Sequence, residues 1–434
     1  MIKKLFFLLP FFFLFVRIVP AQGLLTAEDA LATGLKNNFD LQISRGEASV
    51  DSVNNSPGAA GMLPSVTLNG SASFDKNDGI HQRFSNGNDI FSANSTSSNL
   101  SSSIALSWTL FDGTKMFVTK QRLEQMQVQG MYEFKARVNS VSKDILLAYY
   151  DVVQQKKLLK ALDEIIALGK ERVLISETRL AAGLAPKTDL LQAKIDLNLQ
   201  QENRIAQEQA LGTARRKLNS LLARDILAVF DVSDSIPAGV LSDRKALEQK
   251  MLASNPDLAA FKLELDIAKL SLREARTGYL PRLDLLGGYN FSHTENSAGF
   301  SLLSQNYGWQ GGLTLSVPLY SAGTNRRNVR IAQIGEQTAE ARFAQARLTA
   351  SLRLHDALDN FDSRLRMLQL EKENETLARE NVRIALDRLR LGQGTSIEVR
   401  QAESTLAEVL SRLVRVQYEL KSAELAVKAE AVEL

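Results

Sequence analysis

The segment SVTLNGSASF, residues 65–74, alternates between two kinds of side chain along its whole length. Its even-numbered residues are apolar or small, and its odd-numbered residues are polar but uncharged. Alternation with a period of two predicts a β-strand with one apolar and one polar face. Because the polar face carries small side chains without charge, the pattern favours a strand that crosses a lipid bilayer.

Four segments share this alternation, and they predict strands over residues of about 65–75, 101–111, 282–292 and 309–320. A tilted transmembrane β-strand needs about 9–11 residues. Arg282 and Asp284 interrupt the third strand, and we assign them to its periplasmic end. Pro318 has no N–H group to donate, so we expect it at a bulge or a strand end. A soluble antiparallel sheet with one wet face remains the alternative.

Large aromatic residues stand on these strands near their ends, where side chains of the membrane interface belong. They are Phe74, Trp108, Phe111, Phe291, Trp309 and Tyr320. The linkers 76–99 and 294–307 are rich in Ser, Asn and Gly, which predicts external loops.

Four strands cannot enclose a pore, because closed membrane barrels begin at about eight strands. An open sheet edge in lipid leaves unpaired N–H and C=O groups, each costing several kcal/mol. If the strands cross a membrane, their edges must therefore pair with other copies of the chain.

The N-terminus predicts a secretory signal peptide over residues 1–21. Lys3 and Lys4 precede the apolar run 5–16, and small residues follow at 19–21. This run is shorter than the roughly 20 residues of a membrane-spanning helix. A buried N-terminal helix is the alternative, and Arg17 leaves the cleavage position undefined.

Charge and cysteine content exclude several kinds of protein. Removal of residues 1–21 takes away three basic residues and leaves 49, which equals the number of acidic residues. A neutral mature chain offers no basic face for nucleic acid. The sequence has no cysteine, which excludes disulfides, thiolate metal sites and a lipidated N-terminal cysteine.

The mature chain is an internal duplication. The tetrapeptide NFDL at 38–41 recurs as NPDL at 255–258, and GMLP at 61–64 recurs as GYLP at 278–281 with the same separation. Later motifs also recur, including the run R-L-x-x-G. We therefore predict two structural repeats, residues 22–223 and 243–434, joined by a connector over 224–242.

Each repeat contains a long segment without proline, residues 114–182 and 324–391. Both are rich in good helix formers, and continuous helices of that length would extend about 100 Å. Seven-residue spacing of Leu370, Leu377 and Ile384 favours side-by-side helix packing. A plain coiled-coil rod is the alternative interpretation of these segments.

Glycine and proline predict a sharp turn at the end of each long helix, around 183–186 and 392–394. Thr395 and Glu398 fit a capping box for the second return helix. Return helices are expected at about 188–223 and 396–431. One helix is expected before the first strand of repeat one, and helices over about 243–277 open repeat two.

The run L-x-L-S-x-P-L-Y-x-x-G at 313–323, the x-L-P lead into strands at Pro64 and Pro281, and the R-L-x-x-G turns resemble the TolC-type outer-membrane efflux family. The likeness covers essentially the whole mature chain. It implies a mainly α protein with transmembrane β: a homotrimer whose four strands per protomer build one 12-stranded β-barrel, continued by a long α-helical barrel. It also implies an outer-membrane efflux or type I secretion channel that docks, tip first, on a periplasmic adaptor coupled to an inner-membrane transporter.

The resemblance also implies two sets of site residues. Carboxylates just past the tip glycine close the tunnel in this family, which points to Asp189 and Glu398. Relatives can hold a second acid three residues later, where this chain has Gln192 and Gln401. Both acids also lie in first helical turns, where the helix dipole alone favours them by about 0.3–1 kcal/mol. The residues expected to dock on the adaptor are Arg179, Leu180, Gly183, Arg388, Leu389 and Gly392.

We find no pattern of an enzyme, a metal site or a cofactor site. The histidines His81, His293 and His355 are expected in two external loops and one long helix, without metal-ligand spacing. No glycine-rich phosphate loop follows a strand. Two other functions stay open at this point: a periplasmic coiled-coil adaptor or rod without a pore, and a surface protein that binds through its polar loops.

Overall fold

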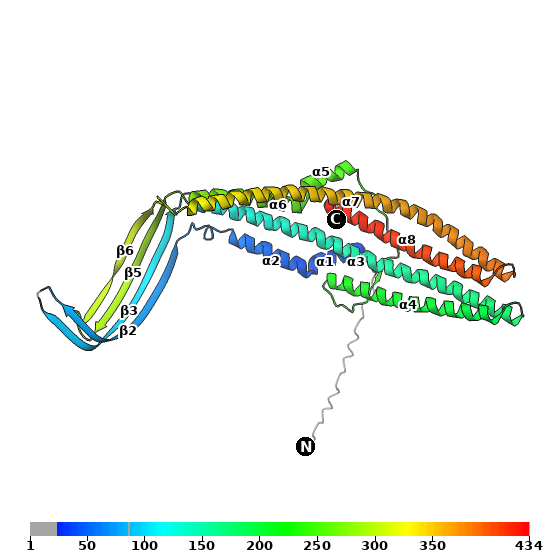
Figure 1. Cartoon of the computed structure of the whole chain (residues 1–434), viewed down its shortest axis with the longest axis horizontal. Coiled ribbons are helices and arrows are strands. Elements are labelled where there is room, and N and C mark those ends of the chain that lie inside the picture. Colours follow the sequence, from blue (N-terminus) through cyan, green and yellow to red (C-terminus); the bar gives the residue numbers. More distant parts are fainter. Residues whose placement is uncertain (1–23, 86, 434) are drawn as a thin grey trace, which may run out of the picture.

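The computed structural model describes residues 24–85 and 87–433, so the expected signal peptide lies outside the described residues. The protein is elongated, with a four-stranded sheet at one end and long helices over the rest (Figure 1). The sheet contains β2 (Ser65–Arg83), β3 (Asp89–Phe111), β5 (Arg282–Asn296) and β6 (Leu303–Ser316). Its order is β2-β3-β5-β6, and all neighbours are antiparallel.

The first two strands are longer than the sequence predicts. The sequence predicts an external loop over 76–99, and this prediction is wrong. β2 and β3 stay paired in one register from Ser65 opposite Ser107 to Arg83 opposite Asp89. Polar side chains are compatible with strands outside lipid, and cross-strand pairs stabilise this extension. Arg83 pairs with Asp89 at 2.8 Å, and the His81 ring stacks on Phe91. His81 and His293 therefore lie in strands and not in loops.

The last strand ends earlier in the chain than the sequence predicts. β6 stops at Ser316, although the sequence predicts a strand to about residue 320. Pro318 follows two residues later and cannot continue the hydrogen-bond ladder. Tyr320 consequently lies beyond the strand and is 89% exposed. The 294–307 linker is also partly strand, and only 297–302 connect β5 to β6.

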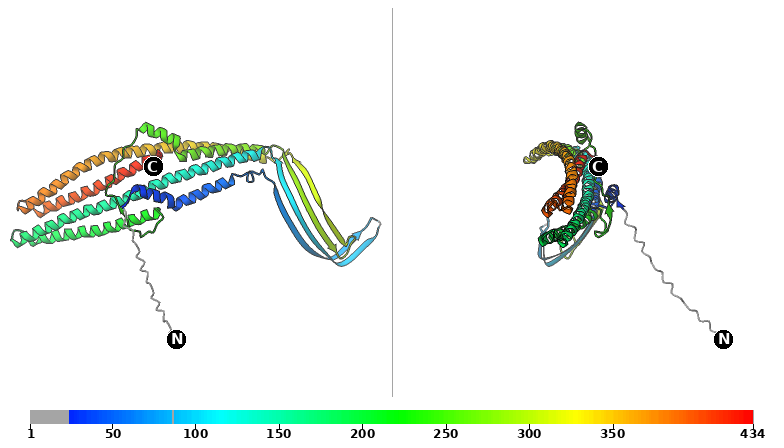
Figure 2. Two further views of the ribbon diagram at one scale, coloured as in Figure 1. Left: turned by 180° about the vertical axis from the view of Figure 1, so that it is seen from behind. Right: turned by 90° about the vertical axis from the view of Figure 1, so that its right-hand side faces the viewer.

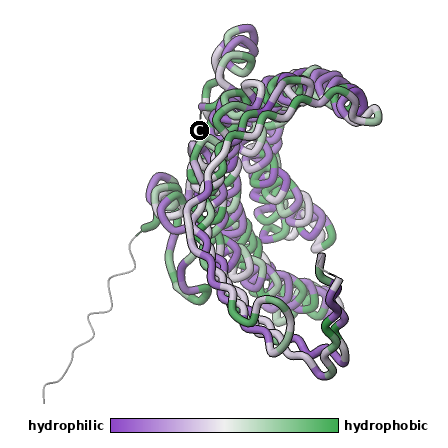
Figure 3. The backbone as a smooth tube through the Cα atoms, turned by 90° about the vertical axis from the view of Figure 1, so that its left-hand side faces the viewer, coloured by the Kyte–Doolittle hydropathy of each residue, from purple (hydrophilic) through white to green (hydrophobic). Residues whose placement is uncertain are grey.

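The pairing register gives the sheet one apolar and one polar face. Leu68 lies opposite Ile104, Ile104 opposite Tyr289, and Tyr289 opposite Trp309, so all share one face. This apolar face comprises Val66, Leu68, Phe74, Leu100, Ile104, Leu106, Trp108, Leu285, Tyr289, Phe291, Tyr307, Trp309, Leu313 and Leu315. The other face carries mainly Ser, Thr, Asn and Gln, and the resulting alternation of colour along the strands is visible in Figure 3.

Two short helices precede each half of the sheet. They are α1 (Ala27–Asn37) and α2 (Phe39–Asn54) in the first half, and α5 (Arg244–Ser254) and α6 (Pro256–Thr277) in the second. The sequence predicts one helix before the first strand, but Asn38 ends α1 and caps α2 by accepting the Leu41 N–H. Asn255 does the same between α5 and α6, where it accepts the N–H of Asp257. An asparagine side chain satisfies the free N–H groups of a new helix and so favours a break at both places.

Two helical hairpins form the rest of the protein. α3 (Lys115–Ala181) and α7 (Thr324–Arg390) contain 67 residues each, which corresponds to about 100 Å. α4 (Lys187–Leu221) returns along α3, and α8 (Ser396–Glu430) returns along α7. Seen along the molecule, the helices form a curved, open wall (Figure 2). None of the helices within residues 24–85 and 87–433 is long and apolar enough to span a bilayer.

The hairpins are joined by packed apolar residues of α3, α7 and α8. Near the tips, Ile165 of α3 packs with Val382 of α7 and Leu406 of α8. Near the middle, α3 packs with α4 and with the connector, where β4 (Asp231–Val232) pairs in parallel with β1 (Leu24–Leu25). The connector is thereby a structural part of the helical wall.

Candidate functional site at the helical tips

Both hairpins turn in the same way. Gly183 and Gly392 have φ values of +71° and +73°, a conformation that residues with a Cβ rarely adopt. The Gly183 N–H donates to the Leu180 carbonyl, and the next N–H donates to Arg179. Gly392 and Gln393 repeat these bonds to Leu389 and Arg388. This is the Schellman arrangement, which explains the glycine of the R-L-x-x-G run but not its arginine and leucine side chains.

The two arginines of the run hold the tips in shape. Arg179 Nη1 donates to the Leu389 carbonyl at 2.9 Å and so joins the first tip to the second. Arg388 donates to the Gln393 carbonyl at 3.1 Å and lies 3.5 Å from the Glu398 carboxylate. Leu389 is buried between the hairpins. Among the expected docking residues, Arg179 and Leu389 therefore already take part in contacts within the protomer.

The expected constriction residues open the two return helices. Asp189 lies in the first turn of α4, and Glu398 lies in the first turn of α8, where Thr395 accepts its N–H. Gln192 donates to Asp196 on its own helix at 2.7 Å, and Gln401 is exposed. The two acids belong to different hairpins, so a ring of carboxylates would need several hairpins around one axis.

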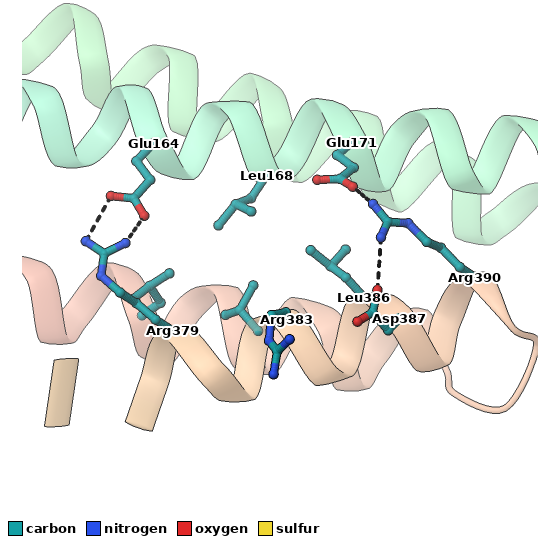
Figure 4. Close-up of a pocket in the computed structure, with 10 residues that line it drawn as sticks. Glu164, Leu168, Glu171, Arg379, Arg383, Leu386, Asp387 and Arg390 are labelled. Atoms are coloured by element: carbon teal, nitrogen blue, oxygen red, sulfur yellow. Dashed lines mark hydrogen bonds and ion pairs between the residues drawn. The ribbon is translucent and has the colours of Figure 1, made fainter. Parts of the chain in front are cut away.

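A groove of about 250 Å³ runs between α3 and α7 just inside the tips. Figure 4 shows Glu164 and Glu171 of α3 directed towards Arg379 and Arg390 of α7, with Leu168 and Leu386 between the pairs. Glu164 pairs with Arg379, and Glu171 pairs with Arg390. No local spacing in the sequence predicts these pairs, because the partners are more than 200 residues apart.

The two exposed pairs of this groove contribute little individually. Ion pairs at the surface stabilise a protein by about 0–1 kcal/mol each, since water solvates the separated charges well. The apolar contact below them supplies most of the attraction between the hairpins. The groove is therefore a place where hairpins can separate without a large loss of ionic interaction.

A second set of charged side chains lies buried between the two hairpins, and no local sequence pattern predicts it. Arg172 of α3 donates to Asp196 of α4 at 3.0 Å and lies 3.3 Å from Glu403 of α8. Burial raises the pKa of Glu403 to about 7; Arg172 opposes this shift and Asp196 adds to it.

Charged groups also fasten the connector to the middle of the wall. Lys156 of α3 binds Asp231 at 2.6 Å and Asp234 at 2.9 Å. Glu424 of α8 is fully buried and accepts the Gly239 N–H at 2.8 Å. Lys421 and Lys428 neutralise this carboxylate at 3.0 and 2.7 Å. Any side chain at residue 239 would collide with Glu424, because a Cβ there would lie 2.2 Å from its Oε1.

Aromatic residues lie at both ends of the apolar face, and Tyr289 and Trp309 lie level with Ile104 in its middle. Trp108 and Phe111 lie near the helices, and Trp108 Nε1 donates to the Met62 carbonyl at 2.9 Å. Phe74 lies towards the opposite end, opposite Ser98. Trp108 and Ser98 are about 10 residues apart on β3, or about 33 Å along a strand. A strand tilt of about 40° reduces this to about 25 Å, the height of the apolar band of an outer-membrane barrel.

The remaining aromatics lie on or beside the apolar face. Trp309 packs edge-on against Tyr289, with ring centroids 5.0 Å apart. Phe291 lies opposite Tyr307 and Ser102, four residues along β5 from Glu295, which is level with Phe74 through Ser98. Within residues 24–85 and 87–433, no three His, Asp or Glu side chains come together as metal ligands.

Comparisons with known proteins agree with this geometry. The family model described as "Outer membrane efflux protein" matches residues 31–224 and 247–430. The proteases secretion protein PrtF of Dickeya chrysanthemi is 26% identical over 416 residues, which cover 92% of this chain and 85% of PrtF. The outer membrane protein TolC of Vibrio cholerae is 21% identical over 324 residues, covering 74% of each protein.

Solved structures show the same fold. CusC aligns with a TM-score of 0.78 at 18% identity, over 93% of this chain and 91% of CusC. The outer-membrane channel OprN aligns with a TM-score of 0.76 at 18% identity, over 93% of this chain and 89% of OprN. The expected fold of transmembrane β-strands continued by a helical barrel is thereby confirmed. Since the family model spans both halves, the chain belongs to the outer membrane efflux protein family, and it is a channel protein of the outer membrane.

Proposed function

We propose that three copies of this chain form one tunnel across the outer membrane and into the periplasm. β2 and β6 are the edges of the sheet and carry hydrogen-bonding groups that no strand of the protomer satisfies among the described residues. Pairing β6 of one copy with β2 of the next closes 12 strands into a barrel. This closure removes the edges, which lipid does not tolerate.

Exposed apolar residues on the helices support the same assembly. In the isolated protomer, α2 exposes Phe39, Ile43 and Val53, while α7 exposes Leu348, Leu352 and Leu370. α2 leads into β2, and α7 follows β6, so both helices lie at the flanks of the protomer. Each flank therefore has a complementary apolar partner in a neighbouring copy.

Transport through this tunnel would be passive. The polar face of the sheet, turned inward in a closed barrel, lines a water-filled lumen with Ser, Thr and Asn. Nothing in such a lining couples an energy source to movement. An inner-membrane transporter would supply the energy, and a periplasmic adaptor would connect it to the tips.

The tips carry features that suit an adaptor. Leu184, Leu391 and Ile397 are about 70% exposed around the two turns. Exposed apolar residues beside arginines are typical of protein contact surfaces. PrtF is named for protease secretion, which makes a type I secretion partner one candidate, and efflux pumps are the other.

Asp189 and Glu398 are proposed to narrow the periplasmic end, with Gln192 and Gln401 one turn further in. Three copies would supply six carboxylates from the first turns of α4 and α8. Opening would move the α7–α8 hairpin away from α3 along the groove of Figure 4. We further propose that the two repeats are copies of one ancestral unit and that the chain catalyses no reaction.

The apolar face of the sheet carries this proposal, and bilayer electrophysiology tests it. Purified full-length protein added to a planar bilayer should give stepwise, ohmic currents. A preparation that inserts into the bilayer but conducts no ions would contradict the tunnel.

A further inference from the structure

One group of charged side chains lies buried where the two hairpins meet. Arg172, Asp196 and Glu403 come from α3, α4 and α8, and together we call them the Arg172 cluster. Arg172 is 2% exposed and Glu403 is 6% exposed. Burying charges is costly, so such a cluster inside an apolar contact requires an explanation.

The two carboxylates of the cluster are held unequally. Asp196 accepts hydrogen bonds from Arg172 at 3.0 Å and from Gln192 at 2.7 Å. Glu403 lies 3.3 Å from Arg172 Nε without hydrogen-bond geometry, and its Oε1 has no partner among the described residues. With both acids ionised, one guanidinium faces two carboxylates, and one buried negative charge is left over.

Two charged side chains among the described residues act on the Glu403 carboxylate. Arg172 faces it from α3, and Asp196 faces it from α4. Val382 and Leu386 of α7 pack in the apolar cluster that contains Leu406, one turn further along α8. The charged residues Arg383 and Asp387 of α7 lie beside Leu406 in the groove between α3 and α7. A proton bound to Glu403 would neutralise the extra charge without moving a helix.

The position of the cluster connects it to the tips. Glu403 lies about two turns inside α8, and Arg172 lies nine residues before the end of α3, so both are about 10–15 Å from the turns. Separating the α7–α8 hairpin from α3 would expose Glu403 to water while leaving the bond between Arg172 and Asp196 intact.

We propose that the Arg172 cluster is a proton-sensitive clasp that holds the two hairpins of a protomer together near their tips. Its role in a channel rests on the function proposed above. The packed arrangement binds a proton on Glu403 more tightly than the separated arrangement does, because burial raises the pKa of Glu403 to about 7. The clasp is strongest below the ordinary carboxyl pKa of about 4.3, and it weakens as the pH rises through about 7.

The expected size of the effect follows from linkage. Between pH 5.5 and pH 8, the ratio of separated to packed hairpins should rise on the order of tenfold per protomer. Glu403→Gln keeps the shape of the protonated acid and removes its titration. Glu408→Gln is the matched control, because Glu408 is an exposed acid on the same helix.

Electron–electron distance measurements test the clasp directly. The chain has no cysteine, so Leu174→Cys on α3 and Ser404→Cys on α8, both at exposed positions, accept spin labels without competing sites. In the full-length protein, the labels should move apart between pH 5.5 and pH 8, and the Glu408→Gln variant should behave alike. The Glu403→Gln variant should stay packed at both pH values.

Two results would overturn the clasp: a distance distribution that does not change with pH, or a Glu403→Gln variant that still titrates. Bilayer currents from the same samples separate this outcome from failure of the proposed function. Channels that conduct, but whose label distances respond to pH in the same way with and without Glu403→Gln, would refute the clasp alone. Absent currents with a pH-dependent distance would refute the tunnel alone.

Discussion

An arginine at Leu68 should obstruct insertion into lipid, and an arginine one residue later should not. Leu68 is 74% exposed on the apolar face, opposite Ile104. Ile104 lies between Trp108 and Ser98, so Leu68 is near the middle of the apolar band. Arginine facing lipid at mid-depth costs about 2–4 kcal/mol, or about 6–12 kcal/mol for three copies in one barrel. Asn69 points to the opposite face, where arginine would meet water.

The assay uses the two tryptophans of the chain, Trp108 and Trp309, which both lie in the sheet. Their fluorescence therefore reports on the strands alone during urea-controlled folding into lipid vesicles. Leu68→Arg should lower the midpoint urea concentration strongly, because a loss of about 2–4 kcal/mol corresponds to a change of about 30- to 1000-fold per copy. Asn69→Arg should fold like the wild type and lower the cation selectivity of the pore. Equal loss in both variants, or a larger loss for Asn69→Arg, would show that the lipid-facing side has been assigned wrongly.

Three further predictions concern the helices. Glu424→Leu should destabilise the middle of the helical wall by about 3–5 kcal/mol, because it leaves Lys421 buried without its carboxylate partner. Gly239→Ala should also destabilise the protein, because the added Cβ would collide with Glu424. Thermal unfolding measures both changes. The hydrogen bond from Lys156 lowers the pKa of Asp231, and hydrogen bonds from Lys160 and, to a lesser extent, Lys156 lower the pKa of Asp234. Both acids therefore stabilise the connector at pH values above their ordinary pKa. This stabilisation is lost as the pH falls through the lowered pKa values. Hydrogen exchange of the connector should therefore stay slow at pH 6 and accelerate only in strong acid, whereas early loss near pH 5 would contradict these ion pairs. Replacing both Asp189 and Glu398 by alanine should change single-channel conductance or cation selectivity, and unchanged currents would remove these residues from the constriction.

The long elements were accessible from the sequence because their pattern is local. Absence of proline and richness in helix formers predict helices over 114–182 and 324–391, and α3 and α7 begin and end within one residue of these limits. Period-two alternation locates the four strands that lie in the sheet. Local patterns do not predict a strand that forms only because a neighbouring strand pairs with it. Residues 76–83 have the composition of a polar loop, yet they pair with β3.

The functional sites were less accessible. The tip glycines follow from turn chemistry, but the link from Arg179 to the Leu389 carbonyl does not, because it joins residues of separate hairpins. The Arg172 cluster is hidden for the same reason. On its own helix each member resembles a solvated charge, and only the meeting of α3, α4 and α8 buries them together.

The number of copies in the purified protein tests the account most directly. Four strands with two open edges require neighbours in lipid, so the mass of the detergent-extracted, full-length protein should correspond to three chains. The protein should also remain in the membrane pellet after carbonate treatment. A single chain that stays dissolved without detergent would contradict the closed barrel, and with it the tunnel.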